Sequence, residues 1–264
     1  MPNVGVNDIQ MYYEVNGEGF PLVMIMGLGG SLDCWDPRMI QGLSRNFKTI
    51  TFDNRGAGRT EASDKEYTIK LFADDTAGLM DALGISRAHV LGISMGGMIA
   101  QELALNHREK VEKLVLCSTY CGGEKSIPPS EETLNSLMRS GGAPSAEESA
   151  KMVVPLCFTD EFVAKNPDTI GSFLERVLKA PTSAEVFLRQ TGAIMGFNTF
   201  DRLPGIKAPT LVLAGKRDIL IPPENGSILA RAIPRAKLVL LQKSAHGLTE
   251  DVEEATTAIA EFLP

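Results

Sequence analysis

The sequence predicts an α/β fold, with a mostly parallel, doubly wound sheet of eight strands and a helical cap inserted between strands six and seven. Short apolar segments alternate with amphipathic ones along most of the 264 residues, as in a parallel sheet whose strands are joined by helices. The alternation stops between about residues 122 and 204, where turns rich in Gly and Pro bound several helical segments. We therefore expect a core made of residues 1–121 and 205–264. Residues 122–204, rooted in the core at both ends, should form the cap rather than an independent domain.

The core begins with an antiparallel hairpin of strands at 4–6 and 9–15, joined by Asn7-Asp8. Six further strands are expected at about residues 21–26, 48–52, 88–93, 112–118, 209–214 and 237–242. Helices are expected at about residues 35–45, 68–83, 95–107, 223–233 and 249–262. Right-handed crossovers should bring the carboxyl ends of the parallel strands to one edge of the sheet.

The cap segment shows helical patterns of its own. Its clearest helix has apolar residues at i, i+3, i+4, i+7 and i+8, namely Ile170, Phe173, Leu174, Val177 and Leu178. Residues 130–139, 145–156 and 183–195 also predict helices, with Ser130 and Ser145 as N-caps. We expect these helices to cover the carboxyl edge of the sheet.

A serine between two glycines follows the strand expected at 88–93. Gly92-Ile93-Ser94-Met95-Gly96 has the G-x-S-x-G pattern and leads directly into a helical segment. This order of strand, serine and helix is typical of a nucleophile elbow, in which the serine hydroxyl projects from a strained turn. The same five residues also fit a Gly-rich turn that packs a helix closely on a strand. A histidine placed to act as the base would favour the nucleophile elbow over this alternative.

The chain has three histidines, and a serine nucleophile usually needs one of them as its base. His89 precedes Ser94 by five residues on the same expected strand, roughly 16 Å away at ~3.3 Å per residue. His107 lies about 20 Å along the following helix at ~1.5 Å per residue. Both are best interpreted as surface or strand-edge residues. His246, in a turn of small residues after the strand at 237–242, is the remaining candidate base.

The third candidate is a carboxylate at another strand end. Asp218 lies in the turn after the strand at 209–214, where it can accept the Nδ1 proton of His246 and stabilise the imidazolium. Alternatively, Asp218 caps a helix or closes an Asx turn. Asp201 and Glu224 do not directly follow a strand-like segment.

The order Ser94, Asp218, His246 resembles the α/β-hydrolase superfamily, and the similarity covers nearly the whole chain. Further segments match the family's patterns, namely residues 22–30, 53–60 (Asp-Asn-Arg-Gly-Ala-Gly-Arg-Thr), 82–85, 209–212 and 245–247. The resemblance implies a Ser-His-Asp triad that requires no metal and no organic cofactor.

The resemblance also implies an oxyanion hole made by the backbone N–H groups of Leu28 and Met95. Gly27-Leu28-Gly29-Gly30 would then form the oxyanion loop, although a flexible turn has the same composition. One departure is Met26, which stands where the family usually has a histidine that hydrogen-bonds the loop. A thioether is a poor replacement for that bond.

Composition excludes several other classes. A net charge of −7 without a basic cluster argues against nucleic acid and anionic membranes as partners. The first residues lack a secretory pattern, and no apolar stretch approaches the ~18 residues of a membrane span. Four cysteines without a C-x-x-C spacing argue against a zinc site, and they are expected as reduced thiols in a cytoplasmic protein. The cysteines are Cys34, Cys117, Cys121 and Cys157. The oligomeric state stays open.

The chain is most similar to the small bacterial carboxylesterases, enol-lactonases and cofactor-free perhydrolases of the superfamily. We expect a serine carboxylic-ester hydrolase that acts on small to medium acyl esters through an acyl-enzyme. A lactone or enol-lactone hydrolase, or a C–C bond hydrolase, would use the same triad. A ligand receptor or pseudoenzyme is the alternative from another class. Haloalkane dehalogenases and epoxide hydrolases are excluded, because both need a carboxylate at the position of Ser94.

Overall fold

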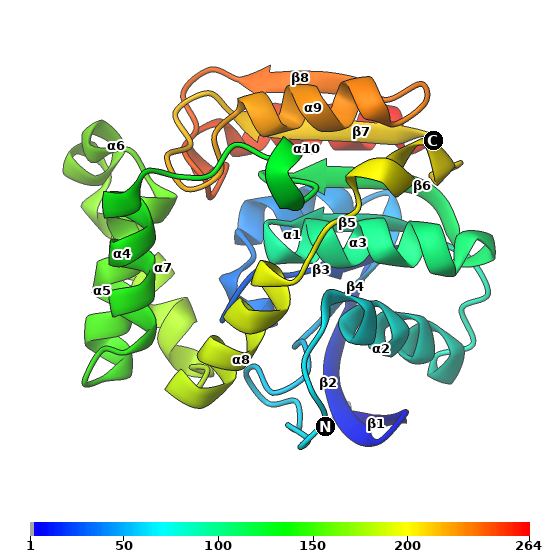
Figure 1. Cartoon of the computed structure of the whole chain (residues 1–264), viewed down its shortest axis with the longest axis horizontal. Coiled ribbons are helices and arrows are strands. Elements are labelled where there is room, and N and C mark those ends of the chain that lie inside the picture. Colours follow the sequence, from blue (N-terminus) through cyan, green and yellow to red (C-terminus); the bar gives the residue numbers. More distant parts are fainter. Residues whose placement is uncertain (1–2) are drawn as a thin grey trace.

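The computed structural model describes residues 3–264. One eight-stranded sheet runs through the molecule in the order β1-β2-β4-β3-β5-β6-β7-β8 (Figure 1). β1 and β2 pair with each other, and β2 with β4, in antiparallel fashion, and the other pairs are parallel. The strands are β1 (Asn3–Val6), β2 (Ile9–Asn16), β3 (Phe20–Ile25), β4 (Phe47–Phe52), β5 (Ala88–Ile93), β6 (Val111–Cys117), β7 (Thr210–Gly215) and β8 (Lys237–Leu241).

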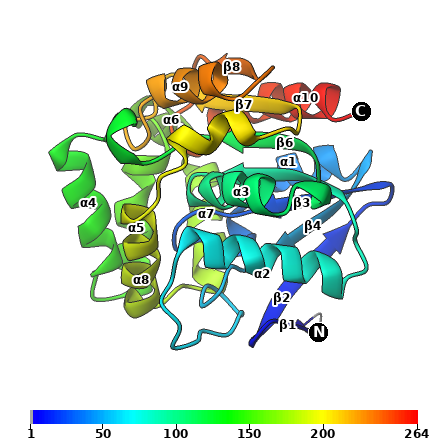
Figure 2. The same cartoon turned by 45° about the vertical axis from the view of Figure 1, so that its right-hand side comes forward.

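Helices cover both faces of the sheet (Figures 1 and 2). One face carries α2 (Ile69–Ala82), α3 (Met95–Asn106) and α9 (Glu224–Ala232), and the other carries α1 (Pro37–Leu43) and α10 (Val252–Phe262). Because both faces are covered, the central strands are mostly apolar on both faces rather than alternating, and every residue of β7 is buried. The predicted doubly wound α/β fold is thus confirmed.

The cap, residues 122–204, is helical and lies between β6 and β7 in the chain. Figure 1 shows most of its helices gathered beside one edge of the sheet. Ser130 and Ser145 accept hydrogen bonds from the N–H groups of Thr133 and Glu148, so both predicted N-caps are confirmed. The cap helices are α4 (Glu131–Gly141), α5 (Ala146–Cys157), α6 (Asp160–Lys165), α7 (Pro167–Lys179) and α8 (Ala184–Met195).

The expected strands and helices are confirmed to within a few residues at each end. The sequence did not predict α6, whose six residues are too few to show a helical period. It also missed five short 3-10 helices: η1 (Leu32–Cys34), η2 (Arg108–Lys110), η3 (Gly123–Lys125), η4 (Phe200–Gly205) and η5 (Thr249–Asp251). In the part of the chain that the structure describes, no helix is long and apolar enough to cross a membrane.

The prediction that His89 is a surface or strand-edge residue was wrong. His89 is only 5% exposed, because Phe20 on the adjacent strand β3 and Phe47 on the next strand, β4, cover it, with ring centroids at 4.7 and 5.8 Å. Burial, helped by the nearby positive charge of Lys113, lowers the pKa of His89 to about 4. His107 is partly exposed at the end of α3 and hydrogen-bonds Asp74 at 2.8 Å.

Candidate active site

Ser94 connects β5 to α3 in a backbone conformation that few residues other than glycine adopt, with φ 56° and ψ −122°. Its N–H donates to the carbonyl of Cys117 on β6 at 2.9 Å. Its carbonyl accepts from the Thr119 hydroxyl at 2.7 Å and from the Gly97 N–H at 2.9 Å. The surrounding core therefore holds the strained residue on both sides, as strain of this kind requires.

The glycines on either side of Ser94 are needed for close packing. A Cβ atom on Gly92 would lie 2.1 Å from the carbonyl oxygen of Gly96, and one on Gly96 would lie 2.0 Å from that of Ile25. Neither contact is possible, so the start of α3 packs directly against the ends of β3 and β5. The two interpretations of the G-x-S-x-G pattern are therefore compatible, since the close packing accompanies the strained serine.

Residues 27–30, which we call the oxyanion turn, lie directly against Ser94. A Cβ atom on Gly27 would be 3.1 Å from Ser94 Cβ. Gly30 N–H donates to the Gly27 carbonyl at 3.3 Å, and Gly29 has a positive φ of 67°, as at the third position of a type II turn.

Two of the N–H groups of the oxyanion turn are already bonded. Gly30 N–H is bound within the turn, and Gly29 N–H donates to Gln190 Oε1 on α8 at 2.8 Å. Within residues 3–264, the N–H groups of Leu28 and Met95 donate to no protein acceptor. These are the two donors that the resemblance implies.

The oxyanion turn is supported without the histidine that Met26 replaces. The Met26 side chain is buried and turned back towards Gly30. The Met26 carbonyl accepts from Asn54 Nδ2 at 2.9 Å, and the fully buried carboxylate of Asp53 accepts from Leu32 N–H at 2.6 Å. Sequence reasoning missed Asn54 and Gln190. Asn54 lies within the 53–60 motif and could have been found there, whereas no sequence signal marked Gln190.

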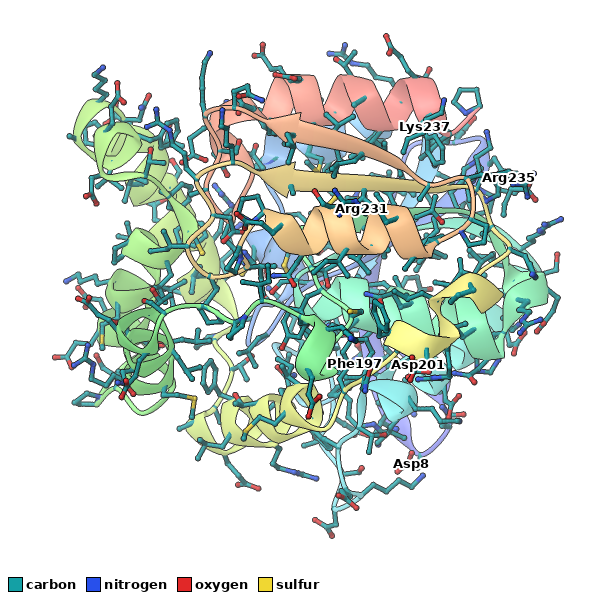
Figure 3. The ribbon with its side chains drawn as sticks, turned by 45° about the horizontal axis from the view of Figure 1, so that its top comes forward. Asp8, Phe197, Asp201, Arg231, Arg235 and Lys237 are labelled. Carbon is teal, nitrogen blue, oxygen red and sulfur yellow. The ribbon has the colours of Figure 1, made fainter. Side chains whose placement is uncertain are left out.

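Asp218 and His246 are in direct contact. His246 Nδ1 lies 2.8 Å from Asp218 Oδ2, and both residues are buried, with exposures of 6% and 4%. The other carboxylate oxygen, Oδ1, accepts from the N–H groups of Leu220 and Ile221 at 2.9 and 2.8 Å. Asp218 therefore makes the alternative Asx-type turn with one oxygen and binds the imidazole with the other. The competing Asp201 is exposed on η4 (Figure 3).

The loop that carries His246 folds back across the end of β7. A Cβ atom on Gly215 would lie within 2.5 Å of the carbonyl oxygens of Ser244 and Ala245, so only glycine allows the loop to pass. Asp251 Oδ2 fixes the loop by accepting from the N–H groups of Lys243 and Ser244 at 2.8 and 2.9 Å. The loop thus brings His246 from β8 to Asp218, which follows β7.

Two cysteines near these loops are unsuited to act as nucleophiles. The carbonyl of Cys157 accepts from Gly247 N–H at 2.9 Å, and Cys34 Sγ would lie 3.5 Å from a Cβ on Gly30. Burial raises the pKa of the Cys157 thiol to about 12 and that of Cys34 to about 11, so both stay protonated near neutral pH. All four cysteines are free thiols. In residues 3–264, no group of His, Cys, Asp and Glu side chains is placed to hold a metal ion.

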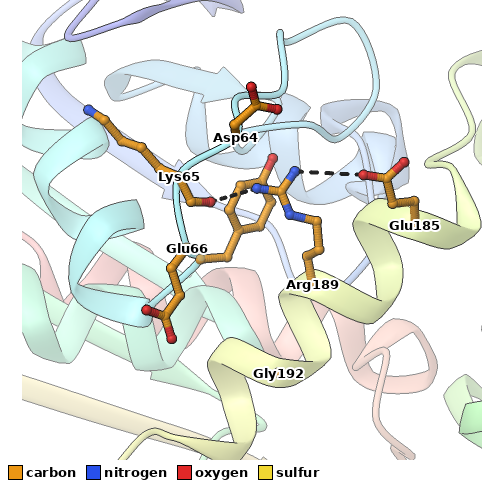
Figure 4. Close-up of a pocket in the computed structure, with 7 residues that line it drawn as sticks. Asp64, Lys65, Glu66, Glu185, Arg189 and Gly192 are labelled. Atoms are coloured by element: carbon orange, nitrogen blue, oxygen red, sulfur yellow. Dashed lines mark hydrogen bonds and ion pairs between the residues drawn. The ribbon is translucent and has the colours of Figure 1, made fainter.

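A surface hollow of about 520 Å³ lies apart from these residues, between α8 and the segment before α2 (Figure 4). Arg189 crosses it, with its guanidinium 3.8 Å above the ring of Tyr67. Neither Ser94 nor the Asp218–His246 pair contributes to its wall. The lining residues are Asp64, Lys65, Glu66, Tyr67, Glu185, Arg189 and Gly192.

Known proteins resemble this chain along almost its full length. The sequence model of the alpha/beta hydrolase fold matches residues 21–251. A putative carbamate hydrolase, RutD, of Azorhizobium caulinodans is 28% identical over 94% of this chain and 92% of its own. A putative non-heme bromoperoxidase, BpoC, of Mycobacterium tuberculosis is 31% identical over 96% and 97%.

Among solved structures, the enol-lactonase from Burkholderia xenovorans LB400 superposes with a TM-score of 0.87 at 30% identity, covering 99% of both chains. The family match spans most of the chain, and the eight-stranded sheet with helices on both faces is the fold that the matching model describes. The chain belongs to the α/β-hydrolase family, and its relatives support an enzyme of the hydrolase class.

Proposed function

We propose that this protein is a serine hydrolase that cleaves carboxylic esters of small to medium acyl groups through an acyl-enzyme. The observation that carries the proposal is the strained backbone of Ser94 at the start of α3. Hydrogen bonds from its N–H to Cys117 and to its carbonyl from Thr119 hold it in place. Strain of this kind persists where the surrounding structure maintains it, typically at functional sites. The N–H groups of Leu28 and Met95, which have no protein acceptor within residues 3–264, belong to the turn that lies against Ser94 and to the residue that follows it.

In the proposed mechanism, Ser94 Oγ attacks the carbonyl carbon of the ester while His246 Nε2 accepts the hydroxyl proton. Asp218 Oδ2 binds the N–H at Nδ1, which selects the tautomer with an unprotonated Nε2 and stabilises the imidazolium. The N–H groups of Leu28 and Met95 bind the oxyanion, and each such donor contributes about 3 kcal/mol. His246 then protonates the leaving alcohol and activates the water that releases the acid.

The relatives support chemistry at an acyl carbonyl but differ in substrate. The names of the RutD relative and of the Burkholderia enzyme refer to a carbamate and an enol lactone, and both compounds contain a carbonyl bonded to oxygen. A lactone or enol lactone is therefore the second candidate substrate. It is favoured by the near-complete overlap with the enol-lactonase structure.

The cap supports a preference for short acyl groups. Gln190 on α8 binds the oxyanion turn, and the carbonyl of Cys157 at the end of α5 binds the loop of His246. Cap helices therefore contact both sides of the proposed site, and we expect them to limit the length of the acyl group that it accepts. Each added methylene should improve binding by about 0.8 kcal/mol until the space is filled, after which clashes reduce it.

The test is kcat/KM across a series of p-nitrophenyl acyl esters, together with lactones and a vinylogous diketone. We expect a maximum between roughly two and eight carbons and no jump at the micellar limit. A maximum at long chains, or interfacial activation, would contradict the acyl-group preference. Slow hydrolysis of every ester beside fast hydrolysis of a lactone or diketone would replace the ester proposal by the second class.

A further inference from the structure

We propose that Gln190, on cap helix α8, is a positioning residue that holds the oxyanion turn in the form that presents Leu28 N–H to the substrate. The inference rests on the proposed hydrolase function. Gln190 is fully buried, and its Oε1 accepts from Gly29 N–H at 2.8 Å. It is separated from that partner by 161 residues in the chain, so the contact joins the cap to the core.

The side chain of Gln190 is fixed at both ends of its amide. While Oε1 binds Gly29, Nε2 donates to the carbonyl of Arg55 at 3.4 Å. Both partners are backbone groups of core loops, so the amide bridges the oxyanion turn and the 53–60 segment. A buried amide bound in this way has one favoured orientation, with the acceptor oxygen facing Gly29.

The hydrogen bond acts on the central peptide of the turn. In a turn of residues 27–30, the peptide between Leu28 and Gly29 can face either way, and the two orientations distinguish type I from type II. The positive φ of Gly29 belongs to the second form. An acceptor on Gly29 N–H stabilises that form. The carbonyl of Gly27 then stays bonded to Gly30, which orients the attached Leu28 N–H away from the interior of the turn.

Helix α8 is well placed to hold Gln190 rigidly. One turn earlier, Phe187 packs on the same glycine, because a Cβ on Gly29 would lie 3.2 Å from Phe187 Cδ2. On the outer side, Arg189 donates to the carbonyls of Ser63 and Lys65 at 2.5 and 2.6 Å. Figure 4 shows Arg189 extending from α8 to this segment. The helix is therefore anchored to the core through Phe187 on its inner face and Arg189 on its outer face.

The test compares Gln190→Met, which keeps the length of the side chain but removes the acceptor, with Thr191→Val. Thr191 is also buried on α8, but its hydroxyl bonds only the Phe187 carbonyl of its own helix. For each variant we would measure kcat and KM on an ester, the melting temperature, and the rate constant for phosphonylation of Ser94 by a fluorophosphonate. Phosphonylation needs the oxyanion donors but no acyl specificity.

In Gln190→Met, kcat and the phosphonylation rate should both fall roughly tenfold to hundredfold, less than the 10²–10³ lost with a whole donor. KM should stay within about threefold, because the donor acts mainly on the transition state. Thr191→Val should stay within about twofold in both rates.

A native phosphonylation rate in Gln190→Met would overturn the inference. A native protein that is not labelled at all would instead overturn the proposed hydrolase function. If Gln190→Met does not fold, the inference can be tested by the hydrogen-exchange rate of the Gly29 amide in the native protein. Gly29 N–H should exchange at least about 100-fold more slowly than a free amide, and unprotected exchange would contradict the hydrogen bond to Gln190.

Discussion

The two proposed oxyanion donors are held by different parts of the molecule. Met95 N–H belongs to the first residue of α3, and its position follows from Ser94 and the glycine contacts within the core. Leu28 N–H belongs to a turn whose central peptide is bonded by Gln190 from the cap. Half of the proposed oxyanion hole would thus be built by the sheet and its helix, and the other half would depend on how the cap packs on the core.

The Asp218–His246 pair belongs with the core half. The carboxylate is oriented by backbone N–H groups of its own turn, and the loop of His246 is fixed by Asp251. The cap adds two hydrogen bonds, from Gly247 N–H to the Cys157 carbonyl and from Thr159 N–H to Glu250 Oε1, each at 2.9 Å. Substitutions of core residues of the proposed site should therefore nearly abolish turnover, whereas substitutions of cap residues should reduce it only partly.

The largest of these effects is expected for Asp218→Asn. An amide at this position can stabilise the imidazole tautomer whose Nε2 is already protonated, so turnover should fall roughly 10³- to 10⁴-fold. The exposed Asp201 provides the matched control, and Asp201→Asn should stay within about twofold. Steady-state kinetics on one ester suffices. A nearly silent Asp218→Asn would mean that another carboxylate serves His246.

Gly27→Ala tests the contact between the oxyanion turn and Ser94. The added methyl would lie 3.1 Å from Ser94 Cβ and 3.3 Å from the carbonyl oxygen of Ile93, which forces the turn outward and should reduce kcat by about 100-fold. Gly171→Ala on α7 is the control, since nothing lies within 4 Å of its added methyl. That control should keep native kinetics and gain up to about 1 kcal/mol of stability. Native kcat in Gly27→Ala would show that the turn does not face the reacting carbonyl.

Arg189→Met tests the seating of the cap from its outer side. Losing the bonds to the Ser63 and Lys65 carbonyls and the stacking on Tyr67 should loosen α8 and lower kcat about threefold to tenfold. Arg139→Met is the comparison, because Arg139 bonds a serine on its own helix. It should leave kcat unchanged. If the two variants have the same kcat, the position of α8 does not affect catalysis, and the prediction is wrong.

His89→Leu should change pH-dependent stability without changing turnover. Because the folded-state pKa is lowered to about 4, the unfolded state binds a proton more tightly as the pH falls below about 6.5. Stability is therefore fully present above that pH and is lost between about pH 6.5 and 4, by at most about 3 kcal/mol. Urea unfolding at pH 7.5 and pH 4.5 should show a smaller difference in His89→Leu than in the native protein. An equal difference would assign the loss to other groups.

Sequence patterns point to the core residues of the proposed site but not to its cap residue. Ser94, Asp218 and His246 each follow an apolar strand in a short turn, so local pattern and chain order suffice to locate them. Gln190 gives no such signal. It is one polar residue on an amphipathic helix, and its partner lies 161 residues away. Contacts of this kind depend on how the cap packs on the sheet, which local patterns do not specify.

The wrong prediction for the exposure of His89 has a related cause. His89 follows Ala88 at the start of β5, where sequence alone suggests an accessible end. Two phenylalanines from other strands cover it, and this follows from the strand order, which puts β3 beside both β4 and β5. The helix α6 was missed because of its short length. The sequence singled out residues 27–30 as a candidate oxyanion loop but gave no sign that Asn54 and Gln190 hold this segment.

The most direct test of the account is the covalent labelling of Ser94. A fluorophosphonate should modify the native protein with one adduct per chain, and peptide mass mapping should place that adduct on Ser94. Ser94→Ala should lose both the adduct and ester turnover, and His107→Gln should keep both. An adduct on another residue, or undiminished ester hydrolysis in Ser94→Ala, would contradict the proposed role of the strained serine.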